Sequence, residues 1–321
     1  MNNLPSVAML AATLALAAAD PARADWPEKP IRAIVPFAPG GANDVVGRVM
    51  SPEISKLLGQ PVIVENKPGA GGNIGLDYVA KSKPDGYTIL YSATASTQNP
   101  ALYRNLPFDP IKDLQPVAEV AQAPYVILVN PKLPFKTAQD LVDYARKNPG
   151  KLNAASGGLG TQLSVEMFKI KNKITLEIIP YPGTGPASVA VRTGTADFAI
   201  MDTSAYTGFL AAGQVKALAV AGEKRLSSLP DVPTTREAGL GDYLAGTLFG
   251  IYVQGATPRD IVEKLNVTVN RIIVTPEMTE RLRRLGSEPN PKSVDVFTKF
   301  VHSEIAAWKV IVKQANIPFV D

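Results

Sequence analysis

Short runs of apolar and β-branched residues alternate with longer amphipathic segments through most of this 321-residue chain. The short runs predict strands at 31–35, 61–65, 87–91, 125–130, 152–155, 176–179, 198–201 and 216–221, and the segments between them predict helices at 43–58, 73–80, 137–147, 161–171 and 187–193. Strands separated by helices at this spacing favour parallel β-sheets built from βαβ units. The alternation therefore predicts an α/β protein.

The alternation divides into two halves of similar size, which predict lobe I at about 25–123 and lobe II at about 124–245. Three successive helices follow, at 258–274, 276–285 and 293–314. Segment 99–116 contains four prolines and no clear periodicity, so we expect it to form a long surface connection.

The first 24 residues are typical of a signal peptide. Residues 4–19 are almost wholly apolar, and Ala22-Arg23-Ala24 forms a small-x-small cleavage site. We expect export to the periplasm and cleavage after Ala24, so that the mature chain begins at Asp25. One feature departs from the usual signal peptide, because no Lys or Arg precedes the apolar run. The alternative interpretation of this segment is an N-terminal membrane anchor.

The composition argues against several classes of function. There is no cysteine, which excludes disulfides, thiolate metal sites and cysteine nucleophiles and fits a periplasmic protein. The single histidine, His302, lies far in sequence from any glycine-rich loop, and no G-x-S-x-G motif exists. We therefore expect no catalytic residue, no metal site and no enzyme activity. A scattered net charge of +4 argues against nucleic-acid binding.

Three of the predicted strand-to-helix corners are rich in glycine, at 36–44, 156–161 and 180–186. The first N–H groups of a helix have no partner within the helix, and the helix dipole adds partial positive charge there. Such a corner binds a carboxylate or a phosphate without any Lys or Arg, and Asn43 is a plausible N-cap in the first one. The alternative, that these corners are ordinary tight turns, weakens when three occur in one chain.

Two further strand ends carry polar side chains. Residues 92–97 offer four hydroxyls, and Asp202-Thr203-Ser204 offers a carboxylate and two hydroxyls. These are either secondary ligand contacts or plain helix caps. Gly69, Gly71 and Gly75 give G-x-G-x-x-x-G, one residue longer than a dinucleotide fingerprint, and no P-loop exists, so we expect no nucleotide cofactor.

Several segments, in order, resemble the receptors of tripartite tricarboxylate transporters, also called the Bug family. They include WPEKPIRAIVPFAPGGANDVVGRV, GQPVIVENKPGAGGNIG, NAASGGLGT and IPYPGTGPA, and the resemblance covers essentially the whole mature chain. It implies a type II periplasmic-binding-protein (Venus flytrap) fold. In this fold each lobe is a mostly parallel sheet flanked by helices, and residues 246–321 return to lobe I.

The resemblance also implies capture of a small carboxylate by backbone amides and bound water, and delivery by a monomeric receptor to a membrane permease. The carboxylate would be a di- or tricarboxylate, an amino acid or an aromatic acid. The chain departs from the family in a shortened second corner, with Gln162 where a His is expected. The implied ligand-binding residues are Phe37, Ala38, Gly40, Gly41, Asn43, Asp44, Thr94, Ser96, Ser156, Gly157, Gly160, Thr161, Tyr181, Gly183, Thr184, Asp202 and Thr203.

Two other functions stay open at this point. The same fold can present its ligand to a membrane kinase, which would make the protein a sensor. A hydrolase or transferase on the same fold is the third alternative, but it would need chemistry that the residue types above do not supply.

Overall fold

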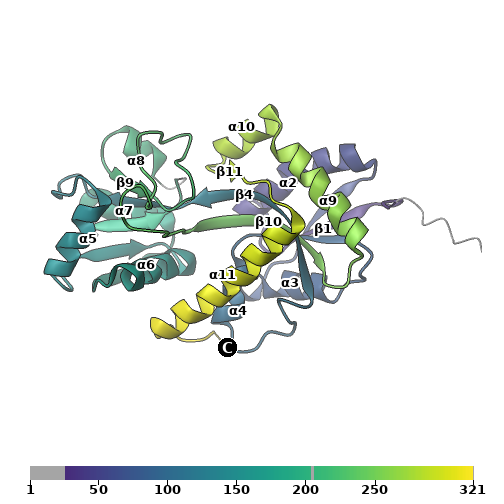
Figure 1. Cartoon of the computed structure of the whole chain (residues 1–321), viewed down its shortest axis with the longest axis horizontal. Coiled ribbons are helices and arrows are strands. Elements are labelled where there is room, and N and C mark those ends of the chain that lie inside the picture. The colour runs from purple at the N-terminus through teal and green to yellow at the C-terminus, as the bar shows by residue number, and fades with distance from the viewer. Residues whose placement is uncertain (1–25, 204–205, 321) are drawn as a thin grey trace, which may run out of the picture.

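The computed structural model describes residues 26–203 and 206–320, and the predicted signal peptide lies outside these residues. Two α/β lobes lie end to end (Figure 1). One lobe contains β1 (Ile31–Val35), α2 (Ala42–Leu58), β2 (Val62–Asn66), η1 (Ala70–Gly72), α3 (Asn73–Ala80), β3 (Thr88–Ser92), α4 (Ala95–Leu102), β4 (Leu114–Pro124), β10 (Gly246–Gln254), α9 (Arg259–Ile273), α10 (Pro276–Arg284), β11 (Glu288–Pro289) and α11 (Val294–Gln314). The other lobe contains β5 (Val126–Val129), α5 (Ala138–Lys147), β6 (Asn153–Ser156), α6 (Leu159–Asn172), β7 (Glu177–Pro180), α7 (Thr184–Thr193), β8 (Phe198–Met201), α8 (Thr207–Ala211) and β9 (Lys216–Val220).

The two-lobed α/β fold is confirmed, but both sheets are mixed rather than mostly parallel. In the order β11-β4-β10-β3-β1-β2, strand β1 is parallel to β2 and β3, whereas β10 is antiparallel to β3 and β4. In the order β7-β6-β8-β5-β9, strand β6 is parallel to its neighbours and β5 is antiparallel to β8 and β9. The reason is that β4 leaves the first sheet towards the second and β10 returns, so the two strands must run in opposite directions.

Strands β4 and β10 form the hinge strands between the lobes, and neither was predicted. Their antiparallel pairing begins where Leu114 lies opposite Gln254 and ends where Pro124 lies opposite Gly246. The predicted surface connection 99–116 is wrong in part, because it contains the end of the buried helix α4 and the start of β4. Strand β4 is buried along nearly its whole length, so it lacks the alternation of apolar and polar residues that marks a half-exposed strand.

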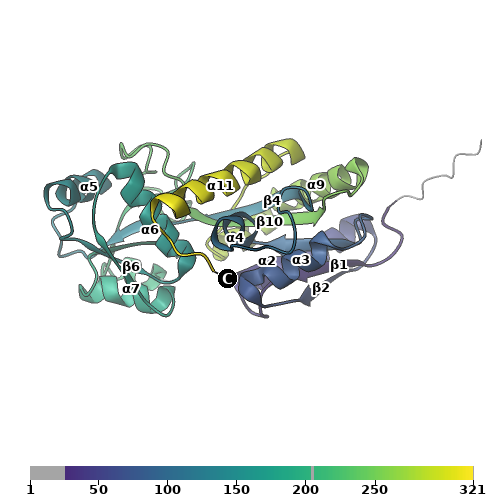
Figure 2. The same ribbon diagram turned by 90° about the horizontal axis from the view of Figure 1, so that it is seen from below.

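Helix α11 lies on one side of the hinge strands and contacts both lobes (Figures 1 and 2). Phe297 and Val301 pack in the core beside β3 and β10, whereas Trp308 and Ile311 pack in the core of the β5–β9 lobe. The C-terminal segment therefore belongs to both cores, although the boundaries of the two lobes remain a prediction. None of the helices in the described ranges has the length and apolar character that a membrane crossing requires.

Candidate ligand-binding site

The first glycine-rich corner follows β1 and leads into α2. The helix begins at Ala42 with Gly41 as its N-cap, so the predicted cap at Asn43 is wrong, and Asn43 lies in the first turn instead. Asn43 is 6% exposed, and its Oδ1 has no hydrogen-bond partner in the described structure. The N–H of Gly41 reaches the carbonyl of Ala38 only at 3.5 Å. This corner therefore retains unused polar groups at a helix start.

The carboxylate of Asp44 holds the first corner in shape. It accepts hydrogen bonds from Arg48 Nε at 2.9 Å, from the N–H of Gly40 at 2.9 Å and from Asn66 Nδ2 at 2.8 Å. The guanidinium of Arg48, together with the Gly40 and Asn66 donors, lowers the pKa of Asp44 to about 2 despite burial. Asp44 is thus ionised and internally satisfied, which gives it a positioning role. A direct contact with a ligand remains a prediction.

The corners after β1 and β3 meet around Gly72. A β-carbon on Gly72 would lie 3.2 Å from Phe37 Cζ and 3.5 Å from the Cβ of Ala95, the first residue of α4. Ser96, by contrast, is 3% exposed and donates to the carbonyl of Ala93 and to the Tyr252 hydroxyl at 2.8 Å. Its side chain is therefore turned into the lobe, and only its backbone N–H is left for a ligand.

The two glycine-rich corners of the other lobe are in direct backbone contact. A β-carbon on Gly157 would lie 2.5 Å from both Cα and N of Thr184 and 2.7 Å from the carbonyl carbon of Gly183. The N–H of Tyr181 also donates to the carbonyl of Ser156 at 2.8 Å. The starts of α6 and α7 are thereby fixed side by side, with their unpaired N–H groups close together.

Both of these helices begin earlier than predicted, at Leu159 and Thr184. The N-caps Gly158 and Gly183 have φ of 147° and 139°, a conformation that favours glycine and lets the chain turn sharply into each helix. The Thr161 hydroxyl closes the first of these corners, since it accepts from the N–H of Gly157 at 2.9 Å and donates to the carbonyl of Gly158 at 2.8 Å.

Gln98 connects the two lobes and was not predicted as a site residue. A β-carbon on Gly160, in the first turn of α6, would lie 3.8 Å from Gln98 Oε1 and 3.4 Å from the Tyr125 hydroxyl. Gln98 is only 7% exposed, and its side chain makes no hydrogen bond with any described residue. One feature of the sequence could have indicated Gln98. It lies four residues beyond Thr94, one turn further along the helix that follows the hydroxyl-rich residues 92–97.

Asp202 and Thr203 follow β8 on the same lobe. Asp202 is half-buried, and its charge adds to burial in raising the pKa of Tyr125 and of Tyr206. Thr203 is 8% exposed, and its Oγ1 lies 2.7 Å from the position of a β-carbon on Gly286, which belongs to the other lobe. These two residues therefore lie where the lobes approach each other.

The structure brings several of the predicted residues into two groups, one where the corners after β1 and β3 meet around Gly72 and one where the corners before α6 and α7 meet, and Gln98 of the first lobe lies next to Gly160 of the second. Figure 2 shows α2 and β1 of one lobe and α7 and β6 of the other on the side away from α11. No Lys or Arg is among the predicted residues. Within residues 26–203 and 206–320 no three His, Cys, Asp or Glu side chains gather to hold a metal. The arrangement suits an anion held by helix starts.

Two α/β lobes joined by two hinge strands, with glycine-rich helix starts in both, have the architecture of a solute-binding protein of the periplasmic type. A family model described as "Tripartite tricarboxylate transporter family receptor" matches residues 46–317. BugT of Bordetella pertussis is 34% identical over 318 residues, which cover 98% of this chain and 97% of BugT. The chain therefore belongs to the tripartite tricarboxylate transporter receptor family, as its sequence motifs predicted.

Solved structures agree with this assignment. An R. palustris protein whose structure contains adipate is 33% identical with a TM-score of 0.72, and the match covers 92% of this chain and 100% of that one. MatC from Rhodopseudomonas palustris, with bound malate, is 33% identical with a TM-score of 0.68, over 89% of this chain and all of MatC.

Proposed function

We propose that the protein captures a small dicarboxylate between its lobes and holds it by backbone N–H groups at the starts of α2, α6 and α7. The observation that carries this proposal is the contact of Gly157 with Thr184, which fixes two helix starts against each other. Each helix start adds about half a unit of positive charge, so two adjacent starts attract an anion without a basic side chain. Adipate and malate in the related structures support a dicarboxylate.

Gln98 would bind the same ligand from the opposite lobe. Its side chain is largely buried, makes no hydrogen bond with a described residue and lies next to the start of α6. Its amide N–H groups are therefore free to donate to a bound carboxylate. The ligand then completes the hydrogen bonding of both lobes, which favours a closed arrangement around it.

A thermal-shift assay on protein stripped of ligand by unfolding and refolding tests this proposal. Adipate, malate and citrate are compared with adipamide, which has the shape of adipate without its charges. A ligand at a hundredfold excess over its Kd stabilises the folded state by about 2.7 kcal/mol. We expect Gln98→Ala to weaken adipate binding about tenfold, since a hydrogen bond to a charged group contributes about 1.5–3 kcal/mol. The exposed Gln214→Ala is the matched control. Absence of stabilisation by every acid would refute the proposal.

We further propose that the protein acts in the periplasm and delivers its ligand to the membrane permease of a tripartite transporter. The family assignment supports this role. Osmotic-shock fractionation and N-terminal sequencing should find a periplasmic protein that begins at Asp25. Cells without the protein should lose uptake of the labelled acid. Normal uptake with a lost transcriptional response to the acid would instead identify a sensor.

A further inference from the structure

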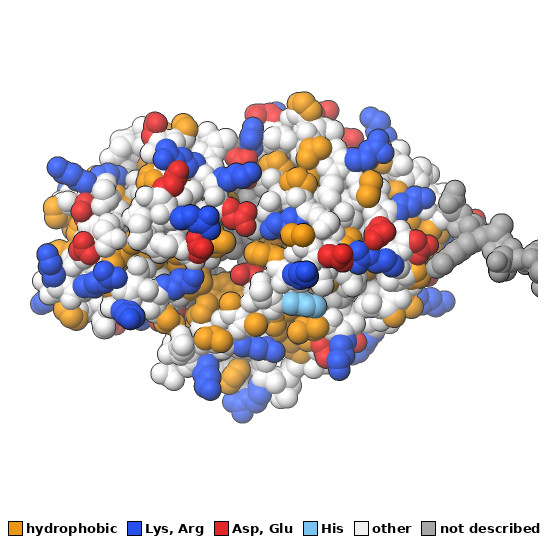
Figure 3. Space-filling model, in the orientation of Figure 1, with side chains coloured by type: hydrophobic (Ala, Val, Ile, Leu, Met, Phe, Trp, Pro, Cys, Tyr) orange, Lys and Arg blue, Asp and Glu red, His pale blue; other side chains and the backbone are white. Residues whose placement is uncertain are grey.

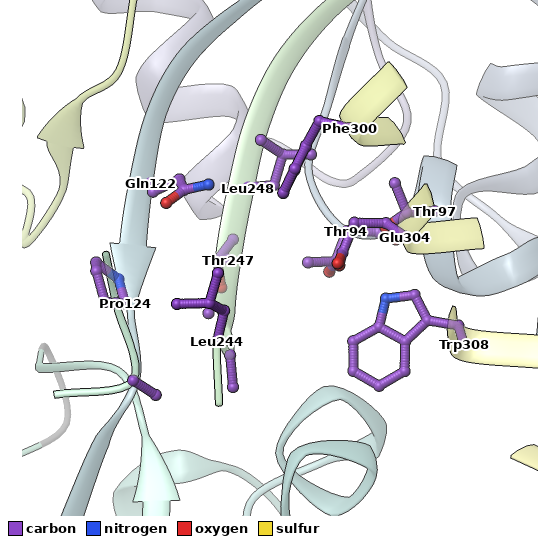
Figure 4. Close-up of a pocket in the computed structure, with 14 residues that line it drawn as sticks. Thr94, Thr97, Gln122, Pro124, Leu244, Thr247, Leu248, Phe300, Glu304 and Trp308 are labelled. Carbon is purple, nitrogen blue, oxygen red and sulfur yellow. Dashed lines mark hydrogen bonds between the residues drawn. The ribbon is translucent and has the colours of Figure 1, made fainter. Parts of the chain in front are cut away.

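A second pocket lies between the hinge strands and α11 (Figure 4). Its walls come from the start of α4, from β4 and β10, from residues 221–222 and from α11. Of the residues predicted to bind the carboxylate, only Thr94 lines this pocket. The face drawn in Figure 3 is hollowed between the lobes, and hydrophobic side chains gather there. The pocket therefore shares Thr94 with the predicted carboxylate-binding residues, but no residue of the three glycine-rich corners lines it.

Glu304 is the one charged residue among the side chains that line the pocket. Beside it are the aromatic rings of Phe300 and Trp308, which belong to the same helix, and the Thr94 side chain from α4 (Figure 4). The indole nitrogen of Trp308 lies towards Glu304, although no hydrogen bond of standard geometry joins the two. The pocket thus presents a carboxylate among aromatic surfaces.

The negative charge of Glu304 has no close cationic partner in the described structure. Burial raises the pKa of Glu304, and the more distant Lys171 and Lys292 offset only part of that effect. Lys292 instead pairs with the buried Glu119 at 2.7 Å and lies over the Phe300 ring at 4.2 Å from its centre. Glu304 is partly exposed where it lines the pocket, and its carboxylate has no opposite charge nearby, which leaves room for a cation from solution.

We propose that this pocket binds a small primary ammonium compound. An ammonium group supplies three donors, which suit the Glu304 carboxylate and the Thr94 hydroxyl, and it is attracted to the face of an indole ring such as that of Trp308. The volume of the pocket that water-sized molecules can occupy is about 50 Å3. A single water molecule takes up roughly 10–15 Å3 of such volume, so the pocket has room for a ligand of up to about four heavy atoms.

Other ligands fit less well. Glu304 would repel an anion, and a neutral molecule would leave its charge unbalanced. A divalent metal ion would need more ligands than the pocket supplies, since no second Asp, Glu or His lines it. An ethylammonium ion has the required size and charge.

The fluorescence of Trp308 gives a direct assay, because the chain contains only two tryptophans and Trp26→Phe leaves Trp308 as the sole emitter. The Trp26→Phe protein is titrated with ethylammonium chloride at constant ionic strength, with ethanol as the neutral analogue of the same size and potassium chloride as the salt control. We expect a saturable change in emission with ethylammonium only. Glu304→Gln should weaken this binding at least tenfold, and the exposed Glu280→Gln should leave it unchanged.

Equal binding of ethanol, or equal binding of ethylammonium to Glu304→Gln, would overturn the proposal. Calorimetry with the unmodified protein covers the case in which Glu304→Gln does not fold, and absence of saturable heat at millimolar ethylammonium would also overturn it. This test does not depend on the carboxylate site.

Discussion

Replacing Gly157 by Ala tests how closely the starts of α6 and α7 must approach. The φ of Gly157 does not lie in the left-handed region, so alanine is acceptable to its backbone, and the effect arises from space alone. The new β-carbon would lie 2.5 Å from two backbone atoms of Thr184. An ordinary contact begins near 3.4 Å, so the two corners must separate by about 0.9 Å.

The structure gives the magnitude of two separate effects. Overpacking of this kind costs about 1–3 kcal/mol of folding free energy. A separation of almost 1 Å also removes at least one amide from hydrogen-bond distance of a shared carboxylate, and such a bond contributes about 1.5–3 kcal/mol. Since about 1.4 kcal/mol corresponds to a tenfold change in affinity, we expect the Kd for adipate to rise about 10- to 100-fold.

Urea denaturation measures the first effect and calorimetric titration with adipate measures the second. Gly208→Ala is the matched control, because no atom lies within 4 Å of its β-carbon position. Unchanged unfolding of Gly157→Ala would refute the packing argument. Normal stability loss with unchanged adipate affinity would refute only the role of these corners in binding.

Three further outcomes are expected. The pKa of Asp44, about 2 when folded against 3.8 ordinarily, means that its contribution of about 2 kcal/mol is fully present above pH 4 and is lost as the pH falls towards 2. Acid titration of the unfolding free energy should show this loss, and Asp44→Asn should abolish it by removing the ion pair with Arg48. Lys292→Met should destabilise the protein by about 3–5 kcal/mol in urea, because it leaves Glu119 charged and buried, whereas the Lys292→Met/Glu119→Gln double variant should recover most of that loss. Asp202→Asn should weaken binding of glutamate, whose ammonium it would attract, but not of adipate, and equal effects on both in calorimetry would contradict this.

The sequence predicted the strands and the glycine-rich corners well because both are local properties. All eight predicted strands are present with ends shifted by at most one residue. An apolar run bounded by Gly or Pro marks a strand whatever it later packs against. The starts of α6 and α7 were placed late, because glycines and Pro186 in a first turn resemble a loop although a helix start tolerates them.

The hinge strands were missed because their pattern is set by tertiary contacts. Strand β10 is buried on both faces between β3 and β4, and its glycines at 246 and 250 sit where a β-carbon would meet neighbouring atoms at 2.6 and 2.8 Å. Glycine ordinarily weakens a strand prediction, but here it allows close packing. To predict that β10 pairs antiparallel with its neighbours, one must also know that the chain returns to the first sheet. No single segment of the sequence shows this return.

Gln98 illustrates why the corners were predictable and the opposing residue was not. A helix start offers unpaired N–H groups wherever it lies, so Gly157 and Gly160 could be named from the sequence alone. Gln98 matters only because α4 lies across the gap from α6, and a polar residue in a short helix ordinarily predicts exposure. Its burial next to Gly160 of the other lobe is the feature that marks it, and burial is a property of the assembled lobes. Residues that meet a ligand from the second lobe therefore have to be found in the structure.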